Sequence, residues 1–433
     1  MIGGGYVGLV SGACFATFGV DVALVETDPR RLGALRDGQM PIYETGLEQL
    51  VADNVAAGRL AFGDDLRAAV DGAEAVFIAV GTPTRRGDGH ADLTYVYAAA
   101  EQVARALTAY AVIVTKSTVP VGTGRRIAEI VRATRPDAEF DVASNPEFLR
   151  EGSAINDFMR PDRVLIGAES ERAQDIMRRL YRPLYLIEAP IVMTGLETAE
   201  LIKYAANAFL AMKVTFINEM ADLCERVGAD VHDVARGIGL DGRIGRKFLH
   251  PGPGFGGSCF PKDTLALVRI AQDAGAPTRL VESVVAVNDA RKAGMAARIV
   301  AACGGSVRGK RIGVLGLTFK PETDDMRDAP SLPIIWNLVE GGASVRAFDP
   351  VGMAQARPLL PESVGYCRDA WDAAQDADAL VVITEWNEFR ALAPARLRET
   401  MRGSVVVDLR NIFDPAAMRA AGFAYRGVGR AAA

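Results

Sequence analysis

Short apolar runs alternate with amphipathic stretches over the first 195 residues, and this pattern is typical of parallel β-strands joined by helices. The apolar runs predict strands over 22–26, 75–80, 111–116, 141–144 and 164–166. From Leu196 onward apolar residues recur every three or four positions, at Leu201, Ala205, Phe209, Met212, Phe216, Met220, Leu223 and Val227. This period predicts one helix of roughly 30 residues.

A second alternating region follows a glycine-rich stretch at 251–257 and further helical sequence to about residue 303. Its apolar runs predict strands over 312–315, 345–348, 379–383 and 405–409. Weakly patterned stretches at 167–172 and 303–309 are interpreted as linkers. We expect an α/β protein with two Rossmann-like doubly wound domains joined by a central long helix and helical segment. The expected domains are 1–195, 196–303 and 310–433.

The charge balance and the cysteines exclude several classes of protein. The 433 residues include 49 Lys and Arg and 54 Asp and Glu, so the net charge of −5 does not attract nucleic acid or an anionic membrane. The cysteines at 14, 224, 259, 303 and 367 show no close pairing, which indicates a reducing compartment, the cytoplasm. With three histidines and no Cys-x-x-Cys, we expect no metal site. No apolar run is long enough to predict a membrane span.

The N-terminal segment Gly3-Gly4-Gly5-Tyr6-Val7-Gly8 has the G-x-G-x-x-G pattern, followed by small residues typical of a helix start. Glycines there permit a tight turn and a close approach of a pyrophosphate to backbone N–H groups. The next predicted strand ends at Glu26, with Asp28 just beyond, where a carboxylate binds the ribose hydroxyls and repels a 2′-phosphate. The pattern therefore predicts NAD rather than NADP. Only Met1 and Ile2 precede the glycines, so we expect either a very short first strand or a true start upstream of Met1.

Polar residues follow three of the predicted strands, on the ligand side of an open parallel sheet. They lie in the segments 80–84, which contains Thr82, and 116–120, which contains Thr118. Ordinary turn chemistry explains either segment alone, but together they indicate a cofactor cleft. Glu147 and Glu151 follow another strand with a spacing of four residues. Glutamates at this spacing are usually solvated, so the spacing alone does not assign them a function.

On the predicted long helix, Lys203 and Asn207 lie four residues apart and share a face. Lys203 is surrounded by apolar residues in the sequence. One interpretation is a lysine whose stem packs on apolar surface while its ammonium reaches water. The other is a buried cation that faces an oxyanion or accepts a proton.

Cys259 lies at the end of the glycine-rich run that starts at Phe248. Pro261 suits the first turn of a helix, so Cys259 is expected just before a helix N-terminus, with Lys262 close by. Both features favour the thiolate form of a cysteine. We interpret the glycines as allowing backbone amides to approach a ligand closely. For the other four cysteines we expect buried packing.

These motifs, taken in order, resemble those of the nucleotide-sugar 6-dehydrogenases of the UDP-glucose/GDP-mannose dehydrogenase family. The resemblance covers nearly the whole chain, through the segments 3–8, 144–152, 248–263, 316–320 and 408–410. It implies a Rossmann domain that binds NAD, a central helical dimerisation segment and a C-terminal domain that binds UDP. The 248–255 segment is nearer to the members that act on UDP-glucose, with GDP-mannose and UDP-N-acetyl-mannosamine as alternative substrates.

The resemblance also implies roles for individual residues. The catalytic residues implied are Cys259 as nucleophile, Lys203, Asn207, Asp263, Thr118 and Glu147. The cofactor-binding residues expected are Gly3, Gly5, Tyr6, Val7, Gly8, Glu26, Asp28, Arg31, Thr82, Thr118, Glu151, Lys262 and Arg327. The substrate-binding residues implied are Glu147, Phe148, Leu149, Lys203, Asn207, Arg243, Phe248, Gly256, Lys320 and Arg410. In a homodimer or higher oligomer, Arg243 would reach the sugar bound by the neighbouring subunit.

The implied reaction is a four-electron oxidation of a primary alcohol to a carboxylate with two NAD+. A thiolate at Cys259 would retain the aldehyde as a thiohemiacetal and then form a thioester for water to hydrolyse. A two-electron hydroxy-acid dehydrogenase would share the Rossmann domain and the lysine-asparagine pair but has no need of Cys259. A non-enzymatic dinucleotide sensor is the other alternative, and it has no use for Cys259, Lys203 and Lys262 together.

Overall fold

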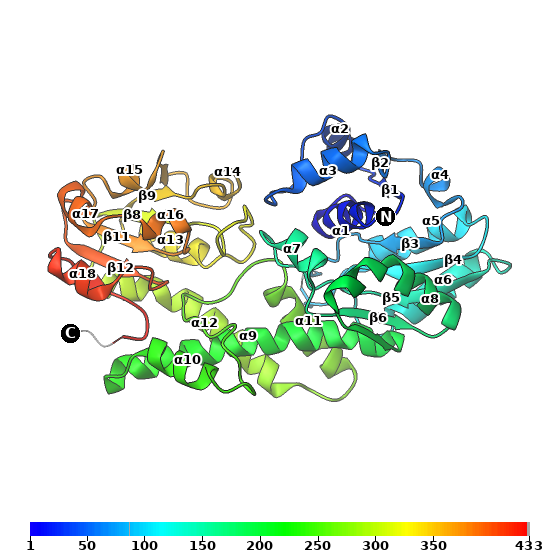
Figure 1. Cartoon of the computed structure of the whole chain (residues 1–433). Helices are drawn as coiled ribbons and strands as arrows, with labels where there is room; N and C mark the ends of the chain where they lie inside the picture. Colours follow the sequence, from blue (N-terminus) through cyan, green and yellow to red (C-terminus); the bar gives the residue numbers. More distant parts are fainter. Residues whose placement is uncertain (86, 431–433) are drawn as a thin grey trace. The chain divides into compact units, whose positions relative to one another are not determined.

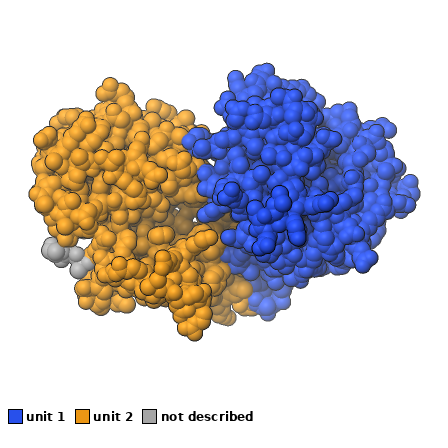
Figure 2. Space-filling view, viewed as in Figure 1, with its two compact units in different colours: residues 1–206, 269–276 blue, residues 207–268, 277–433 orange. Residues whose placement is uncertain are grey.

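The computed structural model describes residues 1–85 and 87–430. The chain divides into two compact units, shown in Figure 2: residues 1–206 with 269–276, and residues 207–268 with 277–433. The long helix α9 (Leu196–Val227, 32 residues) and the helix α11 (Phe260–Asp273) contribute to both units. The predicted helix of roughly 30 residues is confirmed. The predicted division at 1–195, 196–303 and 310–433 stays a prediction.

The first unit is built on strands joined mostly in parallel (Figure 1). They are β1 (Val22–Val25), β2 (Leu60–Gly63), β3 (Ala75–Ile78), β4 (Ala111–Thr115), β5 (Phe140–Ser144), β6 (Val164–Ala168) and β7 (Ile191–Thr194). Strands β3 to β7 lie in chain order, and β1 pairs with β2. The first strand is reduced to Ile2, in agreement with its predicted shortness. Ile2 bridges Val25 and Ile78, and so joins the β1–β2 pair to the five-stranded set β3 to β7.

Two differences from the expected sheet concern β6. This strand pairs antiparallel with β5, so the first sheet is not wholly parallel. The linker predicted at 167–172 is wrong, because residues 167 and 168 end β6 and the helix α8 (Glu171–Leu180) starts three residues later. The apolar run of β6 continues into Gly167 and Ala168, whose small side chains gave a weak hydrophobic signal.

Helices cover both faces of the first sheet. They are α1 (Tyr6–Thr17), α2 (Pro29–Arg36), α3 (Leu47–Ala56), α4 (Leu66–Val70), α5 (Thr94–Ala106), α6 (Thr123–Thr134), α7 (Ala154–Met159), α8 and the 3-10 helix η1 (Arg182–Ile187). Alternate residues of β4 enter different cores: Val112 and Val114 pack with α1, α7 and α8, while Ala111 and Ile113 pack with α5 and α6. This two-sided burial explains why β4 is apolar throughout.

The second unit contains a six-stranded parallel sheet in the order β10-β9-β8-β11-β12-β13 (Figure 1). Its strands are β8 (Arg311–Leu315), β9 (Ser344–Phe348), β10 (Gly365–Tyr366), β11 (Ala379–Val382), β12 (Val405–Asp408) and β13 (Ala424–Arg426). The helices are α10 (Val231–Gly239), α12 (Arg279–Ala302), α13 (Ser331–Glu340), α14 (Met353–Ala356), α15 (Ala370–Ala374), α16 (Asn387–Arg390), α17 (Pro394–Thr400) and α18 (Pro415–Ala420). The predicted fold class, two doubly wound sheets and a long central helix, is confirmed.

Candidate active site

The glycine-rich turn between Ile2 and α1 forms the expected dinucleotide cradle. A Cβ at Gly8 would lie 1.9 Å from the Gly3 carbonyl oxygen, so this position tolerates glycine alone. A Cβ at Gly5 would meet nothing within 4 Å, so packing within the chain does not require glycine there. Gly5 precedes α1, whose N-terminus has no side-chain cap. An open space beside an uncapped helix N-terminus fits a pyrophosphate, so these residues fit NAD.

Glu26 follows β1 and its buried carboxylate is directed at the same turn. Its oxygens accept hydrogen bonds from the backbone N–H of Gly4 (3.0 Å) and of Asp28 (2.8 Å). Asp28 caps α2, where it accepts from the N–H groups of Arg30 and Arg31. These two amides hold the pKa of the Asp28 carboxyl below its ordinary value. The ribose-binding role predicted for Glu26, Asp28 and Arg31 stays a prediction.

Glu44, for which no role was predicted from the sequence, is buried beside this turn. Its carboxylate accepts hydrogen bonds from the Tyr6 hydroxyl and from the backbone N–H of Gly152 (2.6 Å) and Ala154 (2.8 Å). Burial and the hydrogen bond to Glu44 raise the pKa of Tyr6. Glu44 therefore ties the start of α1 to the turn that carries Glu151, which is predicted to lie at the nicotinamide end.

The loops that follow β3 and β4 are joined, as their predicted positions at one sheet edge required. The Thr82 hydroxyl donates to the Thr118 carbonyl oxygen (3.0 Å), and the Ser117 hydroxyl donates to the Val80 carbonyl oxygen (2.6 Å). Thr82 is buried and Thr118 is partly exposed. The structure therefore brings together the two threonines of the predicted cofactor cleft.

Lys203 and Glu147 form a buried ion pair. Lys203 Nζ lies 3.2 Å from Glu147 Oε1, and the two side chains are 3% and 7% exposed. The interpretation of Lys203 as a lysine that reaches water is therefore wrong. The second Glu147 oxygen accepts from the Leu149 backbone N–H, and Lys203 Nζ lies 5.2 Å from the centroid of the Phe148 ring. Four predicted site residues thus meet in the first unit.

A second group of predicted residues meets at the start of α11, in the second unit. The Asp263 carboxylate is 1% exposed and accepts from Asn207 Nδ2 (2.6 Å) and from Lys262 Nζ (2.5 Å). Cys259 immediately precedes α11, and its carbonyl oxygen accepts from the Asp263 backbone N–H (2.8 Å). The thiol of Cys259 is partly exposed, whereas the other four cysteines are buried. The predicted burial of these four cysteines is confirmed, and the role of Cys259 as nucleophile stays a prediction.

The glycine-rich run before Cys259 packs against its own chain. A Cβ at Gly256 would lie 2.3 Å from the Asp328 carbonyl oxygen, and the Gly257 backbone N–H donates to the Arg327 carbonyl oxygen (2.8 Å). The structure therefore supplies a reason for Gly256 that differs from the close ligand approach expected from the sequence. Phe248, at the start of the run, has a φ of 64°, and Leu249 lies in the core.

Arg410 and Lys320 lie at the carboxyl edge of the second sheet. Arg410 donates to the carbonyl oxygens of Ile383 (2.8 Å) and Phe319 (3.1 Å), and so joins the segments that follow β8 and β11. Lys320 Nζ lies 5.5 Å from the Phe319 ring centroid. Asp349 directly follows β9 and is fully buried, accepting from the N–H groups of residues 317, 318, 351 and 352. An acidic residue directly after a predicted strand is a sequence pattern that could have identified Asp349 as a candidate residue at this edge.

Among the predicted site residues of the second unit, Arg327 and Arg243 have exposed side chains. The Arg327 side chain is 65% exposed and pairs with Asp325 (2.8 Å). The Arg243 side chain is 89% exposed and pairs with Asp241 (2.6 Å). An exposed arginine costs little to redirect toward a ligand, because surface ion pairs contribute little stability.

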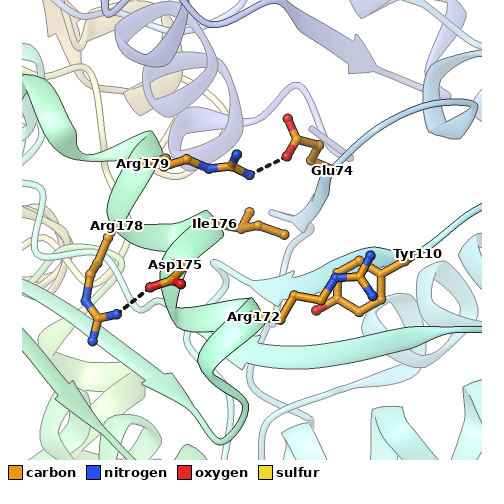
Figure 3. Close-up of a pocket in the computed structure, with 7 residues that line it drawn as sticks. All are labelled: Glu74, Tyr110, Arg172, Asp175, Ile176, Arg178 and Arg179. Carbon is orange, nitrogen blue, oxygen red and sulfur yellow. Dashed lines mark hydrogen bonds and ion pairs between the residues drawn. The ribbon is translucent and has the colours of Figure 1, made fainter.

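A cavity of about 560 Å³ next to α8, drawn in Figure 3, includes none of the predicted residues. Its arginines are already engaged: Arg179 pairs with Glu74, Arg178 pairs with Asp175 (2.8 Å), and the Arg172 guanidinium lies 3.4 Å from the Tyr110 ring centroid. We therefore assign no ligand to this cavity.

Models of the UDP-glucose/GDP-mannose dehydrogenase family match the chain in three consecutive parts: the NAD binding domain over residues 1–185, the central domain over 197–290 and the UDP binding domain over 313–415. The chain belongs to this family. It is therefore an oxidoreductase that uses NAD, and the resemblance inferred from the sequence is confirmed.

Individual relatives cover nearly the whole chain. It is 61% identical over 432 residues to a UDP-glucose 6-dehydrogenase of Rhizobium meliloti (strain 1021), covering 99% of each chain. It is 48% identical to the UDP-glucose 6-dehydrogenase TuaD of Bacillus subtilis (strain 168), covering 100% of this chain and 93% of the relative. The solved structure of a UDP-glucose dehydrogenase from Pyrobaculum islandicum is 41% identical with a TM-score of 0.91, covering 99% of this chain and 97% of that one. Among the described residues, no helix is long and apolar enough to span a membrane.

Proposed function

We propose that the protein oxidises UDP-glucose to UDP-glucuronate with two NAD+, through a thiohemiacetal and a thioester on Cys259. The observation that carries the proposal is the partly exposed Cys259 at the N-terminus of α11, beside the Lys262–Asp263–Asn207 network. The relatives named UDP-glucose 6-dehydrogenase support the choice of sugar. The overall reaction consumes one water and releases two NADH and three protons.

Each proposed chemical step uses a group that the structure presents. NAD+, when bound, accepts one hydride in each of two oxidations. The Cys259 thiolate adds to the aldehyde carbon, and the C–S bond is retained until water displaces the thiol from the thioester. Thr118 and Glu147 hold that water. Lys203 and Asn207 stabilise the developing alkoxide charge, because both side chains are buried, where an electrostatic contact is strong.

Burial of the Lys203–Glu147 pair supports these roles. The buried Glu147 carboxylate lies 3.2 Å from the Lys203 ammonium, so both charges are held where water screens them little. In the second unit, Asp263 orients the Asn207 amide so that its nitrogen points at the carboxylate. This contact also sets the orientation of the Asn207 carbonyl group. A separate contact with Asp263 holds Lys262, which is predicted to contact NAD.

The substrate-binding residues are proposed from the resemblance to the family. They are Glu147, Phe148, Leu149, Phe248, Gly256, Lys320 and Arg410. GDP-mannose and UDP-N-acetyl-mannosamine are the alternatives. Comparing the rates of NADH formation with the three nucleotide sugars distinguishes them. We expect UDP-glucose to give the highest kcat/KM.

We also propose that the enzyme is a homodimer in which Arg243 reaches the site of the neighbouring subunit. In the second unit, four apolar side chains of α9 are 46–65% exposed and recur at intervals of seven, seven and four residues, which places them on one face: Phe209, Phe216, Leu223 and Val227. The exposed Arg243 guanidinium is available to a partner. The cytoplasmic location expected from the cysteines stays a prediction.

The stoichiometry of the reaction tests the function. Wild type should yield two NADH per UDP-glucose consumed and release no aldehyde. Cys259→Ala should form no acid while it keeps its affinity for NAD, because the glycine turn and Glu26 are unchanged. Cys224→Ala, at a buried cysteine, is the matched control and should retain the stoichiometry. A Cys259→Ala enzyme that still made two NADH per sugar at the wild-type rate would refute the thioester.

A further inference from the structure

The first unit contains a second buried lysine close to the Lys203–Glu147 pair. Lys116 directly follows β4 and its side chain is 3% exposed. Its ammonium donates to Asn145 Oδ1 (3.0 Å) and to the Tyr181 hydroxyl (3.1 Å). Neither acceptor carries a charge. Lys116 therefore places an amine in the interior, at a position where an apolar side chain would fill the same space.

The partners of Lys116 are held in one orientation. Asn145 Nδ2 donates to the Leu165 carbonyl oxygen (2.8 Å), so the Asn145 oxygen must face Lys116. The Tyr181 hydroxyl donates to that same oxygen (2.6 Å). The rings of Phe158 and Tyr181 each lie 5.8 Å from the Lys116 nitrogen. Within residues 1–85 and 87–430, no carboxylate forms an ion pair with Lys116. A buried ammonium without such a partner is uncommon.

Two charged groups act on Lys116 across this network. Burial lowers the pKa of Lys116 to about 8, the Glu147 carboxylate raises it and the Lys203 ammonium lowers it. Cys14, on α1, also faces Lys116, but burial raises the pKa of this thiol to about 12, so it is neutral. Burial likewise raises the pKa of Tyr181, which stays a neutral phenol. Since Cys14 and Tyr181 are neutral, the charged groups identified as acting on Lys116 are Glu147 and Lys203.

We propose that Lys116 is a positioning residue that acts through Glu147 and Lys203, and that its positive charge sets the pH range in which this pair works. The inference rests on the proposed function, in which Glu147 and Lys203 contact water and substrate. Electrostatic coupling is reciprocal, so a cation that is affected by this pair affects it in turn. The positive charge of Lys116 attracts the negative charge of Glu147 and repels the positive charge of Lys203.

The position of Lys116 in the fold supports a role at the site rather than in general packing. Ser117 and Thr118 follow it after β4, and Pro146 and Glu147 follow Asn145 after β5. The Lys116–Asn145 hydrogen bond therefore links the ends of two neighbouring strands, two residues before Thr118 on one and two residues before Glu147 on the other.

The pH dependence of kcat tests the proposal with two neutral variants. Lys116→Met retains the approximate length without hydrogen bonding, and Lys116→Gln retains a polar group. Both variants remove the attraction between Lys116 and Glu147, and in wild type Lys116 carries its charge only below its own pKa of about 8. The acid limb of the profile should therefore move upward by about one pH unit in both variants, the shift expected from one nearby buried charge. Tyr181→Phe is the control, because it disturbs the same hydrogen bonds without removing the cation, and its profile should not move upward.

Profiles of the two neutral variants that superimpose on the wild-type profile after scaling would overturn the proposal. So would an equal upward shift in Tyr181→Phe, because the cause would then be the disturbed hydrogen bonds. A purely structural role lowers the rate at every pH and leaves the profile in place.

A second measurement requires no substrate. Lys116 and Lys203 are both cations and repel each other. In urea unfolding near pH 7, Lys116→Met should therefore destabilise the protein less when Lys203 is present than in a Lys203→Met background. Additive effects would refute the coupling. If wild type oxidises no nucleotide sugar, the proposed function fails, and this cycle still decides whether the two lysines interact.

Discussion

Glu200, on the first turns of α9, caps another helix. Its carboxylate oxygens accept from the backbone N–H of Gly122 (2.6 Å) and Gly124 (2.7 Å), at the start of α6, which has no side-chain cap of its own sequence. The side chain is 2% exposed. Burial raises the pKa of Glu200 to about 7, although the two amides lower it in part. The folded chain therefore holds a proton on Glu200 at a pH where the unfolded chain has released it.

The stability consequence of Glu200 can be worked out with its sign. The raised pKa of Glu200 favours folding fully below the unfolded value of 4.5, and this contribution is lost as pH rises through about 7. Between about pH 5 and about pH 8 the loss amounts to about 2–3 kcal/mol. Glu200→Gln cannot titrate and lacks this loss. The difference in unfolding free energy, variant minus wild type, should therefore rise by about 2–3 kcal/mol over this range.

Urea unfolding of both proteins at the two pH values measures this difference, and any constant cost of the glutamine amide cancels. Glu197→Gln is the control, because that carboxyl lies on the same helix but is exposed and has a lowered pKa caused by its hydrogen bond to Arg125. The control difference should stay constant with pH. If Glu200→Gln also differed from wild type by a constant amount, the argued burial of a titrating Glu200 would be wrong.

Three further predictions concern the cofactor turn, the dimer face and the buried ion pair. Gly5→Ala should leave the unfolding midpoint nearly unchanged but weaken NAD binding measured by calorimetry, whereas Gly8→Ala should unfold the protein. Equal NAD affinity in Gly5→Ala and wild type would contradict the proposal that this turn is the dinucleotide cradle. Phe216→Asp should halve the mass measured by light scattering, whereas Leu359→Asp, at a comparably exposed position, should not. A dimeric Phe216→Asp enzyme would exclude this face of α9 as the dimer interface. Lys203→Ala should destabilise the fold by about 3–5 kcal/mol in urea unfolding, because it leaves a buried carboxylate unpaired. It should also slow both oxidations by roughly 10²-fold or more. A variant as stable as wild type would show that the pair is not buried in solution.

The limits of sequence reasoning are clearest in the strands. Of the predicted strands, β4, β6 and β11 are buried at every residue, and a strand covered on both faces has a continuous apolar run. The strands that were not predicted are β2, β7, β10 and β13. Each of them contains exposed or half-exposed residues, and β10 has only two residues. A strand that is not buried on both faces needs no continuous apolar run, so its sequence does not distinguish it from a loop.

The sequence by itself determined the features that depend on short-range pattern. These are the fold class, the long helix, the glycine turn and the position of Cys259 before a helix, since each follows from residues within one element or one loop. Only the tertiary structure decided which side chains meet: Lys203 with Glu147 across 56 residues, Lys116 with Tyr181 across 65, and Glu44 with Gly152 across 108. Such contacts depend on strand register and helix packing, which bring distant segments to one sheet edge. The charge state of a buried lysine or glutamate is decided there too, because it is set by the loss of water and by the neighbours that replace it.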